Sequence, residues 1–220
     1  MERPFHSRLE DLPQLLPVFP LPGVLLLPEG RLPLNIFEPR YLAMVQDALG
    51  WGRLIGMIQP SGPAEPGCEP PLFDVGCAGR ISAFSETEDG RILLTLTGVC
   101  RFKLARELDG VRGYRRVSPD WQPYRADLDE PQDPKLTTER LLAALRPYLR
   151  LKNIDLNWKT LQGASPLVLS VSLPMALPFE AREKQALLEA PDIDTRAETL
   201  LALLEMAVAE GSGLQSTSQQ

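Results

Sequence analysis

Short apolar runs separated by turn residues fill the first half of the chain, and this pattern predicts β-strands. Pro22-Gly23 separates the first two runs, and Asp89-Gly90 and Asp109-Gly110 supply the positive φ that a tight hairpin needs. Many short, mostly antiparallel strands of this kind favour a small barrel or sandwich. The predicted strands are residues 16–21, 24–27, 31–37, 54–59, 75–85, 91–99, 101–107 and 114–117.

One helix interrupts these strands. It begins at Pro39, because a proline in the first helical turn lacks only an N–H that would have no partner there. Gly50 and Gly52 end it. Its apolar stripe has helical spacing and consists of Tyr41, Leu42, Val45 and Leu49.

The pattern becomes helical after an acidic, proline-containing linker at residues 127–134. Thr137 or Thr138 begins the first of these helices, which Pro147 should kink. Ser165-Pro166 begins a second helix as N-cap and N1 residue. Further helices are predicted at residues 179–189 and from Asp194 or Thr195 onward, before a polar tail.

The residue types argue against catalysis. His6 is the only histidine in 220 residues, which removes histidine triads, metal clusters and most general-base schemes. The carboxylate pairs Glu86/Glu88 and Asp127/Asp129 lie in turn or linker segments, where we expect them to be solvated. The cysteines are Cys68, Cys77 and Cys100. They form no Cys-x-x-Cys pair, so we expect reduced thiols and no catalytic residue, metal or cofactor.

Charge and hydropathy restrict the partners. The net charge of −6 disfavours binding along a nucleic-acid backbone, which needs a positive field. The longest apolar stretch, residues 21–28, is too short to span a bilayer. Residues 1–12 are charged and interrupted by Pro4, unlike a signal peptide. We therefore expect a cytoplasmic protein with no membrane partner.

Three blocks of sequence resemble a known family. Leu16-Pro17-Val18-Phe19-Pro20-Leu21, followed by Leu32-Pro33-Leu34-Asn35-Ile36-Phe37-Glu38-Pro39-Arg40-Tyr41, resembles the opening of the substrate-binding domain of Lon proteases, especially its stand-alone bacterial versions. Residues 75–102 resemble the central hairpin of that family, and residues 179–189 resemble a helix near its C-terminal end. The resemblance covers residues 13–209.

The resemblance implies an α+β fold, in which a PUA-like small β-barrel, mostly antiparallel, is followed by a C-terminal helical bundle. In Lon this domain helps to engage unfolded or tagged substrates, ahead of an ATPase module and a Ser–Lys peptidase. The sequence holds no Gly-x-x-x-x-Gly-Lys-[Ser/Thr] phosphate loop, so we expect a binding module without either activity. The expected parts are a flexible N-terminal segment (1–12), the barrel (13–125), a helical subdomain (126–209) and a disordered tail (210–220).

The segment around Phe37 is the most distinctive candidate site. One interpretation places Phe37, Tyr41 and Met44 at a groove for apolar peptide side chains, because aromatic and methionine side chains give large, adaptable contacts. In the alternative, Phe37 and Tyr41 enter the core where a strand joins a helix, and Glu38 pairs with Arg40.

Trp51 and the loop at residues 60–71 are further candidates. Trp51 follows the first helix and is either an exposed binding anchor or a cap over the end of the barrel. The loop is rich in proline and glycine. It is either an adaptable rim of a binding site or an ordinary surface connection.

One basic cluster offers a different function. An RNA would contact such a patch on a PUA-like barrel through its backbone and by stacking. The alternative is a solvated edge strand that its charges protect from aggregation. The residues of this cluster are Arg112, Tyr114, Arg115 and Arg116.

The sequence therefore favours a non-catalytic module that binds unfolded or extended polypeptide, in proteolysis or protein quality control. Contact would come from exposed apolar side chains on the barrel or in a cleft between subdomains, with pairing to an edge strand adding backbone hydrogen bonds. A protease or chaperone is the other expected partner, and RNA binding is the alternative function.

Overall fold

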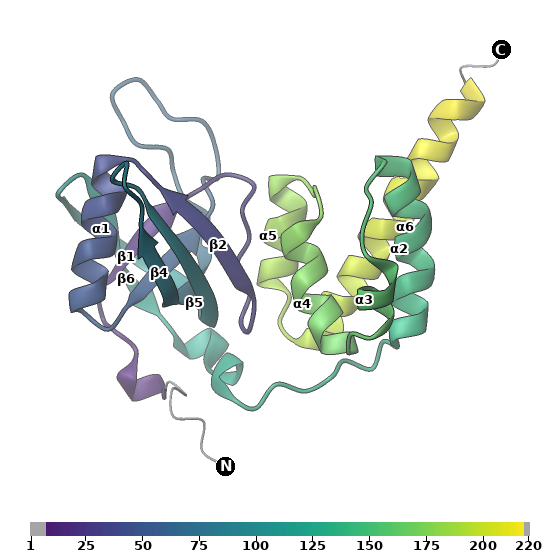
Figure 1. Cartoon of the computed structure of the whole chain (residues 1–220), viewed down its shortest axis with the longest axis horizontal. Coiled ribbons are helices and arrows are strands. Elements are labelled where there is room, and N and C mark those ends of the chain that lie inside the picture. The colour runs from purple at the N-terminus through teal and green to yellow at the C-terminus, as the bar shows by residue number, and fades with distance from the viewer. Residues whose placement is uncertain (1–7, 218–220) are drawn as a thin grey trace. The chain divides into compact units, whose positions relative to one another are not determined.

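The computed structural model of the chain describes residues 8–217, and side chains through residue 211. Its contacts divide the chain into two compact units, whose ribbons are drawn in Figure 1. The sheet unit comprises the residues up to Glu130 together with Pro178–Leu188. The helical unit comprises Pro131–Leu177 and the residues from Glu189 onward. His6 lies outside the described residues, as does most of the N-terminal segment expected to be flexible.

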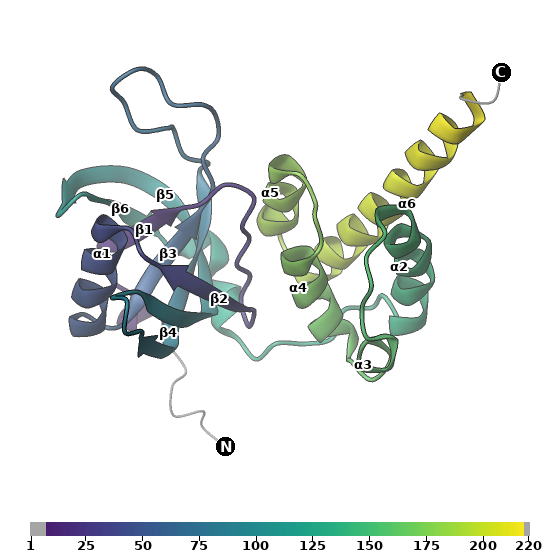
Figure 2. The same cartoon turned by 45° about the horizontal axis from the view of Figure 1, so that its top comes forward.

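Six strands form one mixed sheet in the sheet unit, in the order β2-β5-β4-β3-β1-β6. β1 runs parallel to β3, and the other pairs are antiparallel. β5 also pairs with β6, so β5, β4, β3, β1 and β6 form a closed circuit of strand pairs, to which β2 is added beside β5. Figures 1 and 2 draw these strands. The strands are β1 (Leu16–Pro20), β2 (Arg31–Ile36), β3 (Leu54–Ile58), β4 (Val75–Glu86), β5 (Ile92–Val111) and β6 (Tyr114–Asp120).

β5 corrects two expectations, since the strands predicted at residues 91–99 and 101–107 are one strand of 20 residues. Register shifts let its first part pair with β4 and its second part with β6. The hairpin turn is Arg112-Gly113, where φ is 51° and 85°, and Val111 pairs with Tyr114. Asp109-Gly110 is not the turn, because it falls where the register shifts inside the strand.

Residues 24–27 are not a strand, although Leu25, Leu26 and Leu27 are buried. They lie in a connection that β5 holds by its backbone. Gly98 donates to the carbonyl of Gly30 at 2.8 Å and accepts from the amide of Glu29 at 3.0 Å. A Cβ atom at Gly98 would lie 1.9 Å from the Leu27 carbonyl oxygen, so this close approach requires glycine.

α1 (Pro39–Gly50) forms where it was predicted, with Pro39 in its first turn. Its predicted apolar stripe is only partly right, since Leu42 and Leu49 are half-buried. It packs against β1, β3 and β6. The side chains that face the sheet are buried because they recur at helical spacing. They are Tyr41, Ala43, Met44, Val45 and Ala48.

α5 (Ala181–Glu189) is held against the sheet unit by polar contacts from long side chains. Gln59 donates to the Ala181 carbonyl at 3.0 Å and to Gln185 at 3.1 Å. Lys184 donates to the Gly23 carbonyl at 2.7 Å. Burial lowers the pKa of Lys184, because a charged amine loses its hydration there. The sequence pattern alone grouped α5 with the other C-terminal helices, whereas its contacts group it with the sheet.

The described part of the helical unit contains four helices, and side-chain caps begin three of them. Thr137, Ser165 and Asn157 accept hydrogen bonds from the first turns of their helices. α2 continues through Pro147, and α6 continues to Thr217, into the segment expected to be disordered. The helices are α2 (Thr138–Lys152), α3 (Trp158–Gln162), α4 (Pro166–Ala176) and α6 (Ile193–Thr217).

Candidate functional site

The four aromatic and methionine residues expected to bind peptide do not form one groove. Tyr41 and Met44 are buried on the inner face of α1, where the Tyr41 ring lies 4.1 Å from that of Phe19. Phe37 and Trp51 are 61% and 74% exposed, just before and just after the helix. Twelve helical residues span about 18 Å, so the two exposed rings lie at opposite ends of α1.

Phe37 shares a surface with Leu93, which sequence reasoning missed. Leu93 of β5 pairs with Asn35 of β2, two residues before Phe37, and is 47% exposed. β2 ends at Ile36, and Phe37 directly follows it. Continued alternation from Asn35 puts Phe37 on the face of Leu93, diagonally across from it. The Arg91 guanidinium lies 6.0 Å from the Phe37 ring centroid. We call Phe37 and Leu93 the β2–β5 apolar surface.

A signal for Leu93 is present in the sequence. Ile92, Leu93 and Leu94 are three consecutive apolar residues. A strand directs alternate side chains to opposite faces, so Ile92 and Leu94 are buried and Leu93 must point outward. Phe84 of β4 is also 47% exposed, but it pairs with Leu94 and therefore lies on the opposite face from Leu93.

β2 is an edge strand of the sheet and borders the β2–β5 apolar surface. Among the residues that the structure describes, β2 pairs only with β5, so its other side offers backbone groups to an added strand. Pro33 lies in the middle of β2 and has no N–H to donate. An added strand would therefore gain few hydrogen bonds from β2, and apolar contacts with the β2–β5 apolar surface would have to supply most of the attraction.

Trp51 borders a hollow of about 30 Å³ that Pro13, Leu15 and Pro17 also line. Such a volume holds about one water molecule and no peptide side chain. Trp51 is therefore an isolated exposed ring and not the wall of a deep pocket.

The basic cluster has partners for its charges. Arg112 lies 2.7 Å from Asp47, and Arg115 lies 2.6 Å from Glu107. Arg116 donates to the Asp109 carbonyl at 2.8 Å. The Tyr114 hydroxyl donates to Asp47 at 2.8 Å, and burial followed by this hydrogen bond raises its pKa.

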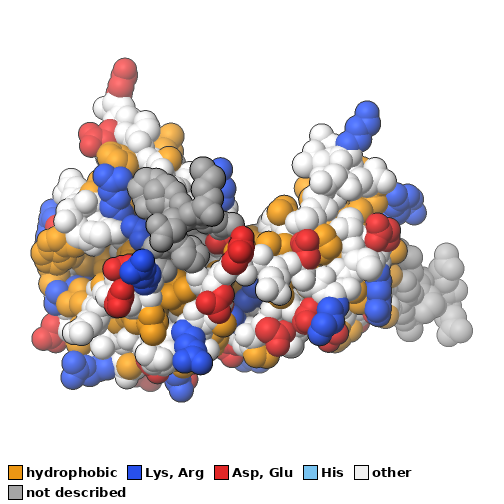
Figure 3. Space-filling view, turned by 90° about the horizontal axis from the view of Figure 1, so that it is seen from below, with side chains coloured by type: hydrophobic (Ala, Val, Ile, Leu, Met, Phe, Trp, Pro, Cys, Tyr) orange, Lys and Arg blue, Asp and Glu red, His pale blue; other side chains and the backbone are white. Residues whose placement is uncertain are grey.

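Two observations weigh against RNA binding. The carboxylates that pair with the basic cluster offset the positive field that a phosphate backbone would need. On the visible part of the face drawn in Figure 3, basic and acidic side chains are interspersed with apolar ones. RNA binding therefore remains a prediction from sequence with no structural observation in its favour.

The loop at residues 60–71 projects from the strands in Figure 2, but its final part is anchored. Arg40 bridges Glu69 at 3.3 Å and Glu38 at 3.0 Å. Arg115 donates to the Pro70 carbonyl at 2.7 Å. The expected pairing of Glu38 with Arg40 is thus present, and it belongs to a contact that ties the loop to the start of α1.

Asp127 is not solvated, which corrects the expectation for the linker carboxylates. It lies in the 3₁₀ helix η2 (Gln122–Leu128) and accepts from the Arg101 side chain at 2.8 and 2.7 Å. Arg101 stacks 4.4 Å from the centroid of the Tyr124 ring. Burial opposes the Arg101 charge, but hydrogen bonds and attraction from Asp127 outweigh it and raise the Arg101 pKa. This cluster is structural, because it lies inside the core of the sheet unit.

Within residues 8–217, no three His, Cys, Asp or Glu side chains are grouped as metal ligands would be. No helix in the same range is both long and apolar enough to cross a bilayer. Cys68 is exposed, while Cys77 and Cys100 are buried thiols.

Sequence comparison decides the family. The model of the ATP-dependent protease La (LON) substrate-binding domain matches residues 15–206. The chain belongs to this family. The Lon resemblance found in the sequence is therefore confirmed, and the match is to the substrate-binding domain and not to the ATPase or protease domain.

Relatives and solved structures agree with this assignment to the Lon family. Lon protease 2 of Myxococcus xanthus is 28% identical over 89% of this chain and 24% of its own length. Lon protease of Anaeromyxobacter dehalogenans is 27% identical over 93% of this chain and 24% of its own length. The chain thus spans about a quarter of the length of these curated relatives.

Two solved structures share the fold. A Lon N-terminal domain protein from Xanthomonas campestris matches with a TM-score of 0.57 and 28% identity, over 86% of this chain and 97% of that one. The N-terminal domain of Mycobacterium avium complex Lon protease matches with a TM-score of 0.55 and 15% identity, over 89% and 98%. The mixed six-stranded sheet and the helices of this chain are therefore arranged like those of solved Lon N-terminal domains.

Proposed function

We propose that this chain binds unfolded or extended polypeptide without chemistry of its own. The observation that carries the proposal is the β2–β5 apolar surface, where Phe37 and Leu93 are exposed side by side in a Lon substrate-binding domain. A folded protein hides most of its apolar side chains, whereas an unfolded chain presents them continuously. An exposed apolar surface therefore selects unfolded chains.

The bound chain would lie extended along β2. Its alternate side chains would contact Phe37 and Leu93, and its backbone would pair with the part of β2 that Pro33 does not interrupt. Few hydrogen bonds and two apolar contacts give a weak, sequence-tolerant interaction. That tolerance suits a partner that is defined by being unfolded and not by one sequence.

We include the barrel form of the sheet and the biological role of the chain in the same proposal. The circuit of strand pairs that closes through β5 supports a small PUA-like barrel. We also propose that a protease or chaperone acts on the polypeptide bound here, in protein quality control. The cytoplasmic setting remains a prediction from sequence.

Retention on immobilised protein tests the function. A disulfide protein, reduced and alkylated so that it stays unfolded, is passed over the immobilised chain beside its own native form. Both forms share one sequence apart from the alkylated cysteines, so the comparison isolates the folded state. We expect selective retention of the unfolded form. Equal retention of the two forms would remove the proposal.

A further inference from the structure

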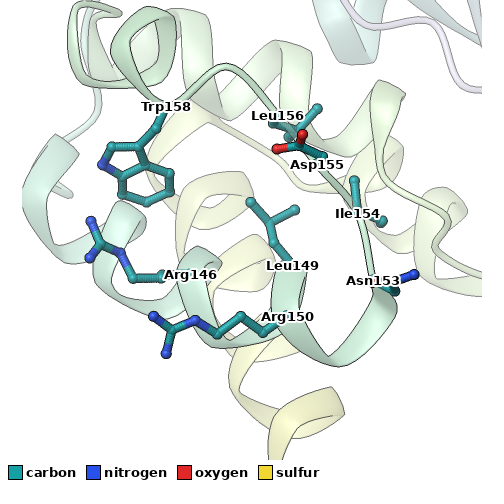
Figure 4. A pocket seen from close by; sticks show the side chains of 8 residues that line it. All are labelled: Arg146, Leu149, Arg150, Asn153, Ile154, Asp155, Leu156 and Trp158. Carbon is teal, nitrogen blue, oxygen red and sulfur yellow. The ribbon is translucent and has the colours of Figure 1, made fainter.

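A hollow of about 380 Å³ lies in the helical unit, between the last turns of α2 and the start of α3. Pockets that bind small ligands begin at about this size. The backbone that forms its wall changes direction after α2, because Asn153 ends this helix with a left-handed φ of 53°. Asn157 then caps α3. The residues around it are Arg146, Leu149, Arg150, Asn153, Ile154, Asp155, Leu156 and Trp158 (Figure 4).

The polar groups of this hollow are mostly donors. Arg146 and Arg150 lie one turn apart on α2, so they share a face. Among the described residues, neither guanidinium forms an ion pair. The Arg146 guanidinium stacks 4.4 Å from the centroid of the Trp158 ring. The Trp158 indole nitrogen is buried with no hydrogen-bond partner in the described part of the chain.

The charged donors and the apolar side chains lie on different sides of the hollow. In Figure 4 the guanidinium groups of Arg146 and Arg150 and the indole nitrogen of Trp158 lie on one side of the hollow. Leu149 and Ile154 line the remainder, and both are buried or half-buried. Asp155 is exposed and carries the one carboxylate of the lining. The hollow thus offers two positive charges, an adjoining apolar wall and one separate carboxylate.

We propose that this hollow binds the carboxyl-terminal residue of a polypeptide that ends in an apolar side chain. The terminal carboxylate pairs with the forked donors of Arg146 and Arg150. The apolar side chain lies against Leu149 and Ile154. Asp155 accepts from a backbone N–H of the bound segment. The inference rests on the proposed polypeptide binding, and it adds a second contact with a different chemistry.

Spacing favours a chain terminus over an internal acidic segment. Arg146 and Leu149 lie three residues apart on α2 and both line the hollow, so charge and apolar wall adjoin on one helix face. A C-terminal residue carries its carboxylate and its side chain on the same Cα atom, and both can be satisfied at once. An internal Asp or Glu places its carboxylate on a separate side chain from the apolar group.

Peptide binding with the full chain tests the proposal. The probe is a fluorescein-labelled hexapeptide that ends in leucine, prepared with a free carboxylate and with an amidated terminus. Amidation removes the charge and replaces one acceptor oxygen with an NH2 donor, while the size of the terminal group hardly changes. We expect the free peptide to bind at least about tenfold more tightly, since hydrogen bonds to charged groups are worth that much or more. Fluorescence anisotropy measures both affinities.

Variants locate the binding. Arg146→Gln combined with Arg150→Gln should abolish the difference between free and amidated peptides, because both charges are then lost. Arg140→Gln, an exposed arginine earlier on α2 that does not line the hollow, should leave it unchanged. All three positions are exposed, so folding is not at stake, and circular dichroism verifies this. Equal binding of the two peptides, or a difference that survives the loss of both arginines, would overturn the assignment.

A third peptide tests the source of the charge. It is amidated and carries a glutamate before its final leucine. Binding as tight as that of the free-carboxylate peptide would overturn the C-terminal assignment in favour of an internal acidic segment. Failure here also differs from failure of the proposed function. Selective retention of unfolded chains with no effect of amidation removes only this inference, while loss of that selectivity removes the proposed function.

Discussion

Arg101 and Asp127 form an ion pair in the interior of the sheet unit, with 2.7 Å between Nη2 and Oδ1 and side chains 3% and 9% exposed. The pair joins β5 to η2 across 26 positions of sequence. Arg101 also donates to the Leu188 carbonyl at 3.0 Å, which brings the end of α5 into the same contact. Arg101 therefore connects β5, η2 and the end of α5. These contacts require that Asp127 balance the charge of the buried Arg101 side chain.

Removal of one partner should destabilise the fold strongly. Asp127→Ala leaves the Arg101 charge buried without its counter-ion, and we expect the free energy of unfolding to fall by about 3–5 kcal/mol. Urea denaturation measures the loss. Asp129→Ala is the matched control, because Asp129 is exposed two residues away and should change stability by less than about 0.5 kcal/mol. Similar losses in the two variants would contradict a structural role for the pair.

Gly98 should tolerate no side chain. A Cβ atom there would meet the Leu27 carbonyl oxygen at 1.9 Å, and backbone cannot move aside as a side chain can. We expect Gly98→Ala to lower the free energy of unfolding by about 3 kcal/mol or more. Gly50→Ala, in α1 with open space around the new methyl group, should be neutral or slightly stabilising. Thermal unfolding of both variants checks the contrast.

Cys100 should make stability fall at alkaline pH. Burial, with the negative charge of Asp127, raises the pKa of its thiol to about 12 from an ordinary 9.0. Between these values the unfolded thiol loses its proton and the folded thiol keeps it. The free energy of unfolding therefore falls as pH rises from about 9, by up to about 1.4 kcal/mol per pH unit.

Comparison with a variant isolates this effect from other groups that titrate in the same range. Cys100→Ser cannot ionise there, so its stability should decline less steeply above pH 9 than that of the unchanged chain. Cys68→Ser removes an exposed thiol and should leave the slope as it was. Identical slopes for all three proteins would show that Cys100 is not protected from ionisation.

Sequence patterns predicted much of the fold, because helix caps and helical spacing depend on residues that are close in the sequence. Pro39 and the stripe around Tyr41 define α1, and Ser165-Pro166 defines the start of α4. The errors lie where distant contacts decide. The sequence around Asp127 predicts a solvated linker carboxylate. Only the fold brings Arg101, 26 residues away, into contact with it.

The candidate site shows the same division. Aromatic and methionine residues near α1 attract attention in the sequence, yet helical spacing buries Tyr41 and Met44 and leaves only Phe37 and Trp51 exposed. Leu93 was missed because its neighbour across the sheet, Asn35, is 58 positions away. The pocket residues Arg146 and Trp158 likewise meet only when α3 folds back toward α2.

The β2–β5 apolar surface should carry the binding of unfolded chains. Phe37→Ser combined with Leu93→Ser removes two exposed apolar contacts without disturbing the core, and we expect affinity for an unfolded polypeptide to fall about tenfold or more. Val168→Ser is the matched control, since Val168 is 52% exposed in the helical unit. Trp51→Ser tests the other end of α1 in the same assay. A loss confined to Trp51→Ser would move the binding site to that end, because Phe37 and Trp51 are separated by the length of the helix.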